Sequence, residues 1–204
     1  MRYKIRKKQI VCGVMAIVIA WCITSIMMQT KETRLQENLA KEVFRFHVLA
    51  NSDSKEDQEL KLKVKEEIIS YMKEQLPESE SVGMTKEWTK NHLKEIKKVA
   101  ETTLAKEGSK DQVKVGVTNC YFPDKTYGDI TFPRGNYDAL RIEIGAARGQ
   151  NWWCVLYPNL CFIDAVHAVV PEDGKEELKQ VLDEEEYQMV TATSKFKIRW
   201  FFFR

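Results

Sequence analysis

A basic N-terminus followed by one long apolar run is the feature that most constrains this chain. Residues 10–28 contain no charged side chain over nineteen positions, and charge returns only at Lys31. A helix of that length spans about 28 Å, close to the thickness of the hydrocarbon core of a bilayer. Five cations and no anion precede the run, namely Arg2, Lys4, Arg6, Lys7 and Lys8.

This order of charge and apolarity predicts the topology of the chain. Basic flanks stay on the cytoplasmic side of a membrane, so everything after Met28 is expected to be exported. The alternative is the core helix of a soluble protein. It is disfavoured because apolar residues lie all around the helix and the basic run stands at the chain start.

The sequence leaves open whether the apolar segment is removed after export. A signal peptide ends in a small-residue cleavage site, and neither 20–22 (Ala-Trp-Cys) nor 24–26 (Thr-Ser-Ile) fits that pattern. Cys22 would suit a lipoprotein, but the bulky Trp21 before it does not. An uncleaved anchor is therefore preferred to a cleaved peptide. We expect a basic tail and signal or anchor helix over 1–29, a polar helical stalk over 30–41 and one exported domain over 42–204.

The charge balance argues against nucleic acid as a partner. The whole chain has 32 Lys and Arg against 30 Asp and Glu, a net charge of +2. Subtracting the five N-terminal cations leaves 27 against 30, so residues 10–204 carry −3. A mildly acidic body offers no counter-charge to a phosphate backbone. Its roughly 175 residues suffice for one hydrophobic core and are few for two.

The periodicity of apolar residues predicts a single α+β domain. Helical spacing predicts two long helices and a shorter C-terminal one, over 54–76, 85–106 and 171–186. Alternation predicts strands over 42–50, 113–118 and 140–144, with a hairpin or a strand and turn over 151–162. Residues 123–135 are expected to be rich in turns, and residues 145–149 are expected to form a loop of small residues. The helices are expected to pack on a mixed or antiparallel sheet.

Three cysteines bear on the chemistry of the exported part. A hairpin turning near Tyr157 and Pro158 would place Cys154 opposite Cys161, and thiols outside the cell oxidise. A disulfide closing so short a loop would contribute about 2–3 kcal/mol in the chain-entropy model. The alternative is two buried free thiols. Cys120 is left without a partner in either case.

The sequence predicts neither a metal site nor a cofactor. His47, His92 and His167 share no metal-ligand spacing, and no phosphate-binding or nucleophile-elbow motif is present. A nucleophilic pair of Cys154 with His47 or His167 is the remaining enzymatic alternative.

The C-terminal run over 195–202 alternates basic with aromatic residues. Three interpretations stay open: an edge strand of the sheet, a face against lipid headgroups, or a segment that docks on a partner. The edge strand is preferred.

Two groups of motifs resemble one known family. Residues 44–54 read FRFHVLANSDS and residues 56–64 read EDQELKLKV. Further on stand YGDITFP (127–133), GNYDALRI (135–142), GQNWWCVLYP (149–158) and LCF (160–162). These motifs, in this order, resemble the stage II sporulation protein R family. The basic N-terminal tail and the apolar segment also fit that family. Asn159 stands where a second proline is expected, which changes the stiffness of that turn.

The resemblance implies a signalling function. Members of that family are exported from the forespore into the space between the forespore and mother-cell membranes. They activate a membrane-embedded aspartic protease of the mother cell, which processes the precursor of sigma-E. The resemblance therefore implies a non-enzymatic activator that works by binding, with that protease as partner.

Polar and aromatic side chains of these motifs are the candidate partner-binding residues, namely Asn51, Ser52, Asp53, Asn151, Trp152, Trp153 and Tyr157. The alternative to partner binding is ordinary packing for the tryptophans and helix capping for Asp53. For Asp53, helix capping is preferred. A secreted hydrolase acting on envelope material through Asp53, His47 or Cys154 is the rival function. A structural coat or anchor protein is a third.

Overall fold

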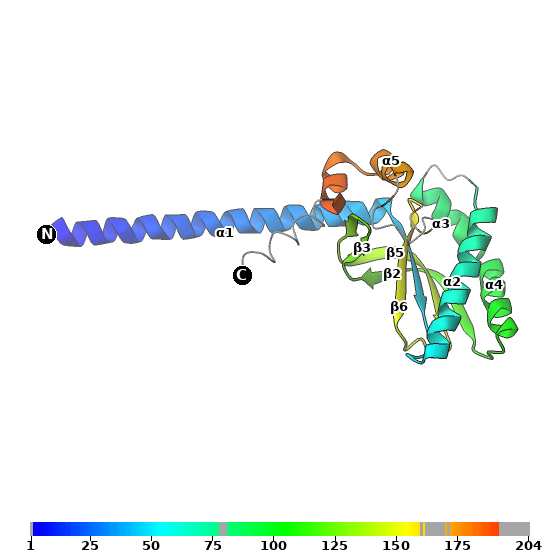
Figure 1. The fold of residues 1–204 in the computed structure, drawn as a ribbon. Helices are drawn as coiled ribbons and strands as arrows, with labels where there is room; N and C mark the ends of the chain where they lie inside the picture. The colour runs from blue at the N-terminus through cyan, green and yellow to red at the C-terminus, as the bar shows by residue number, and fades with distance from the viewer. Residues whose placement is uncertain (1, 78–80, 160, 162–169, 171, 192–204) are drawn as a thin grey trace. The chain divides into compact units, whose positions relative to one another are not determined.

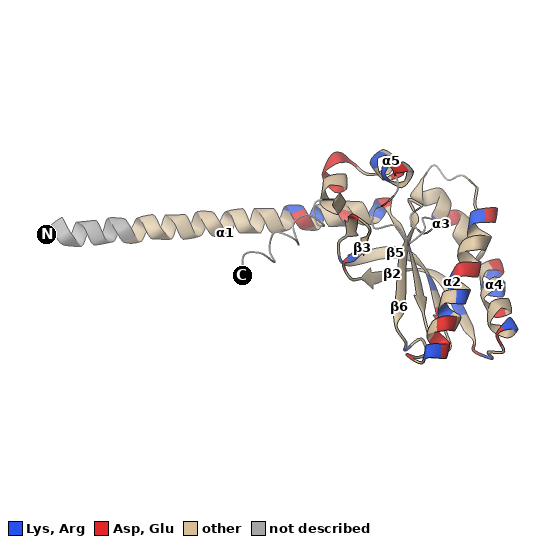
Figure 2. Ribbon diagram, viewed as in Figure 1, with Lys and Arg blue, Asp and Glu red and all other residues tan. Residues whose placement is uncertain are grey.

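The computed structural model describes residues 2–77, 81–159, 161, 170 and 172–191. The chain forms two compact units, residues 1–37 and 38–204, and the boundary lies inside the predicted stalk. One helix, α1 (Arg2–Glu42), contains the predicted apolar run. Its part from Val11 to Glu42 is long and apolar enough to cross a membrane, with a mean hydropathy of 2.3 in its most apolar stretch and none of that stretch buried. Figure 2 shows that this stretch is free of charged side chains.

The second unit is built on a four-stranded sheet with the order β2-β5-β1-β6. The strands are β1 (Phe44–Leu49), β2 (Val113–Phe122), β5 (Gly135–Ile144) and β6 (Asn151–Tyr157). β1 runs parallel to β5 and antiparallel to β6, while β2 runs antiparallel to β5. The sheet is therefore mixed, and the α+β class predicted from the sequence is confirmed. All six residues of β1 are buried, so this inner strand is covered on both faces.

Helices α2 (Lys55–Gln75) and α4 (Leu93–Lys106) cover one face of the sheet, with α3 (Val82–Asn91) beside them (Figure 1). α2 begins after Ser54 and not after Asp53, because the Ser54 hydroxyl accepts a hydrogen bond from the backbone N–H of Asp57 at 3.1 Å. Each fully buried aliphatic side chain contributes roughly 1.5–3 kcal/mol relative to an exposed one. This helix-covered core contains Phe46, Val48, Val64, Ile68, Ile96, Ala100, Leu140 and Ile142.

The opposite face is covered over only part of its area. A second core forms there from the end of α1, the hairpin of β3 (Lys125–Tyr127) and β4 (Ile130–Phe132), and α5 (Glu172–Val181). These elements pack against Tyr137, Ala139 and Val155 of the sheet. Lys114, Thr118 and Asn151 stay exposed. We call this side of the sheet the open face.

Two expectations about the helices are wrong in detail. The helix expected over 85–106 is broken at His92, whose ring stacks on Trp88 and whose Nδ1 lies 2.8 Å from the Trp88 carbonyl oxygen. The helix expected over 171–186 ends at Val181, and residues 184–191 form a separate helical segment.

That last break has a local cause. Asp183 and Glu186 form a capping box, in which each carboxylate accepts a hydrogen bond from the other residue's backbone N–H. A new helix therefore starts there. The C-terminal run over 195–202 lies outside the described residues, as does His167.

The turn between β1 and α2 is fastened to the loop between β5 and β6. Asn51 accepts hydrogen bonds from the backbone N–H groups of Ala146 and Arg148, at 2.8 and 3.1 Å. The N–H of Gly149 donates to the carbonyl of Ala50 at 3.0 Å. A Cβ atom on Gly149 would overlap the carbonyl oxygen of Ser52, so the two loops can approach only because this residue is glycine.

We therefore expect Gly149→Ala to destabilise the domain by about 1–3 kcal/mol, because backbone and not a flexible side chain must move. Urea denaturation of the full chain in detergent measures the change. Gly116→Ala is the matched control, since its added Cβ meets nothing within 4 Å and should shift stability by less than about 1 kcal/mol. Equal losses in the two variants would contradict this account of the turn.

Candidate functional site

Arg45 of β1 is the most unusual residue of the open face. It is 0 % exposed, although it carries a full positive charge. Its guanidinium carbon lies 4.3 to 5.9 Å from the centres of four aromatic rings, those of Phe122, Tyr127, Phe132 and Tyr137. These rings supply cation–π attraction in a site from which water is excluded. We call this group the aromatic box.

The hydrogen bonds of Arg45 connect the box to the edge strand β6. Its Nε donates to the carbonyl of Cys154 at 3.0 Å, and Nη2 donates to the Tyr127 hydroxyl at 3.1 Å. That hydroxyl donates in turn to the carbonyl of Trp153 at 3.0 Å. Nη1 has no hydrogen-bond partner among the described residues. The β3–β4 hairpin, β1 and β6 are thus joined through one side chain.

A second cluster lies next to the box on the open face. The His47 ring stacks on Trp153 with centroids 3.8 Å apart and planes inclined by 18°. Its Nε2 lies 3.1 Å from Oδ1 of Asn151, and its Nδ1 lies 4.0 Å from Sγ of Cys120. A cysteine, a histidine and an amide in this order are the groups of one type of nucleophilic triad.

The electrostatics of this cluster oppose nucleophilic chemistry. Burial lowers the pKa of His47 from 6.5 to about 4, a shift that the Asn151 hydrogen bond opposes and the charges of Arg141 and Arg45 increase. Burial raises the pKa of the Cys120 thiol. Both groups are therefore neutral near pH 7, whereas a reactive cysteine needs thiolate character.

Cys154 and His47, one of the two pairs that the rival hydrolase could use, do not meet, and the other histidine, His167, lies outside the described residues. His47 lies opposite Trp153 in the β1–β6 register, and Cys154 is the next residue along β6. Successive side chains of a strand point to opposite faces, so Cys154 points into the helix-covered core while His47 lies on the open face. Asp53 accepts from the backbone N–H of Gln150 at 2.7 Å, away from both.

The three candidate residues at the β1–α2 turn are engaged in hydrogen bonds within the domain. Beside its bonds to the β5–β6 loop, Asn51 donates through Nδ2 to Asp57 at 3.0 Å, and the Ser52 hydroxyl donates to the same carboxylate. These bonds lower the pKa of Asp57, the bond from Ser52 most of all. Asp53 does not cap α2, because Ser54 does.

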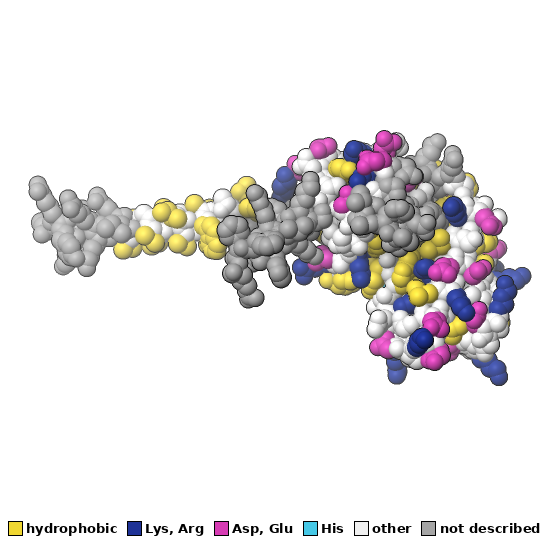
Figure 3. All heavy atoms as spheres, viewed as in Figure 1, with side chains coloured by type: hydrophobic (Ala, Val, Ile, Leu, Met, Phe, Trp, Pro, Cys, Tyr) yellow, Lys and Arg dark blue, Asp and Glu magenta, His cyan; other side chains and the backbone are white. Residues whose placement is uncertain are grey.

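The candidates on β6 differ in exposure. Asn151 is exposed, and Trp152 and Trp153 are half-buried, on opposite faces of this edge strand. The Trp152 ring packs edge-on against Phe46, and the ammonium group of Lys65 lies 5.2 Å from its centre. Tyr157 was expected to be exposed and is not: it is only 8 % exposed. We call Asn151, Trp152 and Trp153 the edge surface. Figure 3 shows hydrophobic side chains at the surface in this part of the domain.

The cysteines are unbonded, and the described residues hold no cluster that suits a metal ion. The predicted disulfide between Cys154 and Cys161 is thus not formed in the structure, although Cys161 packs against the core that contains Cys154.

Sequence reasoning missed Arg45, Tyr127 and Cys120 as members of these clusters. The alternation of β1 assigned Arg45 to the polar side of a half-buried strand, and Tyr127 fell in a segment expected to be rich in turns. Arginine between two phenylalanines in a strand was the available signal, because a central strand buries both faces.

The chain is similar to known proteins over much of its length. The model of the family described as stage II sporulation protein R matches residues 40–167. Stage II sporulation protein R of Bacillus subtilis (strain 168) is 36 % identical over 141 residues. That match covers 68 % of this chain and 63 % of the relative, which is less than two thirds of the relative's length. No solved structure matches the chain.

The fold and site define an α+β protein with an N-terminal apolar helix and, among the described residues, no cluster that suits a metal ion. The chain belongs to the stage II sporulation protein R family.

We expect Arg45→Lys to destabilise the domain by about 2–4 kcal/mol, although it keeps the charge. Lysine lacks the planar group that stacks in the aromatic box. It also cannot donate from two separate nitrogens, one to the Cys154 carbonyl and one to the Tyr127 hydroxyl. Thermal and urea unfolding measure the loss. Arg148→Lys is the control, because Arg148 is exposed, and should stay within about 0.5 kcal/mol. Tolerance of lysine at position 45 would show that the box needs only a charge.

The lowered pKa of His47 also predicts a pH dependence. The unfolded chain takes up a proton near pH 6.5 and the folded one only near pH 4. The contribution of neutral His47 to the free energy of unfolding is therefore fully present above pH 6.5. It falls as the pH is lowered from 6.5 to 4, by roughly 3 kcal/mol in total. Urea unfolding of the protein and of His47→Gln at several pH values measures this loss of stability. The variant should not show it. An NMR titration of His47 with a midpoint near 6.5 would contradict it.

Proposed function

We propose that this chain is an exported sporulation signal that activates a membrane-embedded aspartic protease of the mother cell by binding to it. Activation leads to processing of the precursor of sigma-E. The protein acts in the space between the forespore and mother-cell membranes. There it is either anchored by residues 10–28 or released after cleavage of that segment.

The family match over residues 40–167 carries this proposal. That range contains β1, α2 and the β5–β6 region, so it includes the whole edge surface and the aromatic box. The apolar part of α1 suits a signal or anchor segment. The neutral His47 and Cys120 favour an activator over a hydrolase.

The edge surface is the part of the candidate set that suits contact with a partner. Tryptophans contribute much of the binding energy in interfaces, and two of them stand on either side of one edge strand. The aromatic box and the His47 ring support Trp153, through the Tyr127 hydrogen bond to its carbonyl and the stacking on its ring, and Phe46 supports Trp152 on the other face. A surface fixed in advance loses less conformational entropy on binding.

Activation by binding imposes one energetic condition. The protein must bind the active state of the protease more tightly than the inactive state, and about 1.4 kcal/mol of difference shifts that equilibrium tenfold. Loss of a single tryptophan contact is therefore enough to lower activation strongly.

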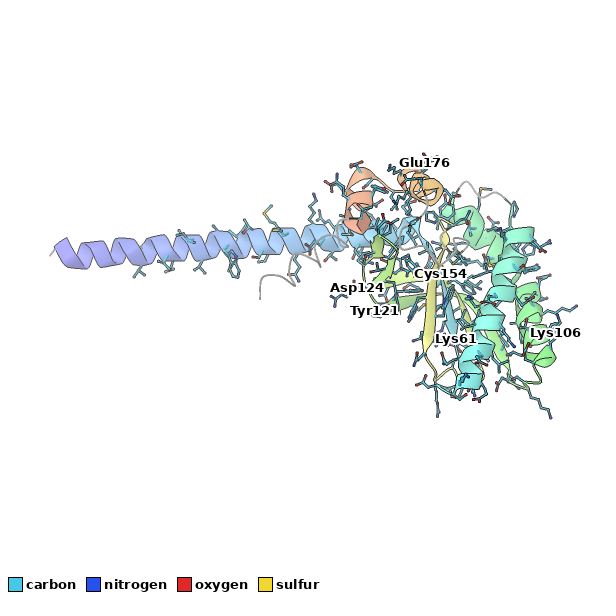
Figure 4. The ribbon with its side chains drawn as sticks, viewed as in Figure 1. Lys61, Lys106, Tyr121, Asp124, Cys154 and Glu176 are labelled. Carbon is cyan, nitrogen blue, oxygen red and sulfur yellow. The ribbon has the colours of Figure 1, made fainter. Side chains whose placement is uncertain are left out.

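Co-expression of the full chain with the protease and the sigma-E precursor in a non-sporulating host tests the function. We expect the chain to increase precursor cleavage, and Trp152→Ala and Trp153→Ala each to reduce that gain at least tenfold at equal protein level. Tyr121→Ala is the matched control, because Tyr121 is an aromatic residue 58 % exposed on β2, the other edge strand (Figure 4).

The outcomes separate the function from its surface. If the unaltered chain produces no gain in cleavage, the proposed function is wrong. If both tryptophan variants remain folded and active, the function stands and the edge surface is not the contact. Loss of activity in Tyr121→Ala alone would move the contact to the opposite edge of the sheet.

A further inference from the structure

Two thiols meet at the end of the edge strand. Cys154 of β6 is 4 % exposed and belongs to the helix-covered core, and Cys161, four residues after β6 ends, packs against the same core. Burial raises the pKa of the Cys161 thiol, and the neighbouring Cys154 thiol raises it further. Figure 4 places Cys154 on β6.

We propose that Cys154 and Cys161 are a redox pair that closes into a disulfide once the domain has left the reducing cytoplasm. Each thiol loses its proton and together they give up two electrons. The acceptor is an external disulfide, either of a small molecule or of a thiol–disulfide exchange protein, which is reduced to two thiols. The proposal rests on the export that the proposed function includes.

The structure makes this pairing selective. Cys120 lies on the open face beside His47, and the sheet separates it from the helix-covered core. Cys12 and Cys22 lie in the apolar part of α1. Cys154 and Cys161 are thus neighbours at one core, while Cys120 packs against the other core.

The bond would act on the edge surface. It would join the turn after Tyr157 to the strand that carries Trp152 and Trp153. The carbonyl of Cys154 also accepts the hydrogen bond from Arg45. One cross-link and one buried cation would then fix the same stretch of β6 from its two sides.

The sequence permits a direct test by mass spectrometry. No lysine or arginine lies between Arg148 and Lys175, so trypsin releases Cys154 and Cys161 together in the peptide 149–175. Cys120 is released separately, in the peptide 115–125. The full chain is expressed in an exporting host, quenched in acid, alkylated with iodoacetamide in denaturant, and digested without reductant.

We expect peptide 149–175 to appear without alkyl groups and about 2 Da lighter than its dithiol form, while peptide 115–125 is alkylated. Treatment with dithiothreitol before alkylation should add two alkyl groups to peptide 149–175. The variant Cys161→Ser should leave Cys154 alkylated, and Cys120→Ser should leave the bond intact. Two alkyl groups on peptide 149–175 without reductant overturn the proposal.

Protease added outside sealed cells or spheroplasts reports export independently. If the domain is exported and peptide 149–175 is a dithiol, the disulfide proposal is wrong and the proposed function stands. If the disulfide is present and precursor cleavage does not increase, the proposed function is wrong and the disulfide proposal stands. A body that stays inside overturns the export on which both depend.

Discussion

The burial of Arg45 is the interaction on which the arrangement of the open face depends. A buried guanidinium group needs compensation for its lost hydration, and this one receives it from four aromatic rings and from two hydrogen bonds, which leave only Nη1 without a partner among the described residues. The rings come from β2, from the β3–β4 hairpin and from β5. The hairpin therefore covers the sheet because it completes the environment of a charge in β1.

The same cation links packing to the surface. Through Tyr127 and the carbonyl of Cys154 it fixes the backbone of β6, and the stacking of His47 on Trp153 fixes one of the exposed rings. On the other face, Trp152 rests on Phe46 of the helix-covered core. The two tryptophans are thus supported by two different cores that share β1. An edge strand built in this way can present large side chains without losing its register.

The turn motif has a different role from the one its residue types suggest. Asn51, Ser52 and Asp53 look like an exposed polar loop, yet their side chains bond to the β5–β6 loop and to Asp57. Gly149 allows that approach. The motif therefore places the start of β6, and Asn151 with it, next to β1. Figure 2 shows many of the charged residues of this unit on its helices.

The sequence by itself determined what depends on local pattern. A run of nineteen uncharged residues and a cluster of five cations are enough to predict the apolar helix, since both act through composition. The period of apolar residues predicted α2 and the strands β1, β2 and β5 for the same reason. The family motifs added the relationship to stage II sporulation protein R, which the comparisons confirm.

The tertiary structure alone decided which residues meet. Arg45 and His47 occupy polar positions of an alternating strand, and they are buried because β1 lies between β5 and β6 and because aromatic rings from other elements pack over both side chains. Cys120 rather than Cys154 lies beside His47 because strand register assigns the two cysteines to opposite faces. Contacts between strands distant in the chain depend on register and sheet order, and neither is encoded in the spacing of residues within one segment.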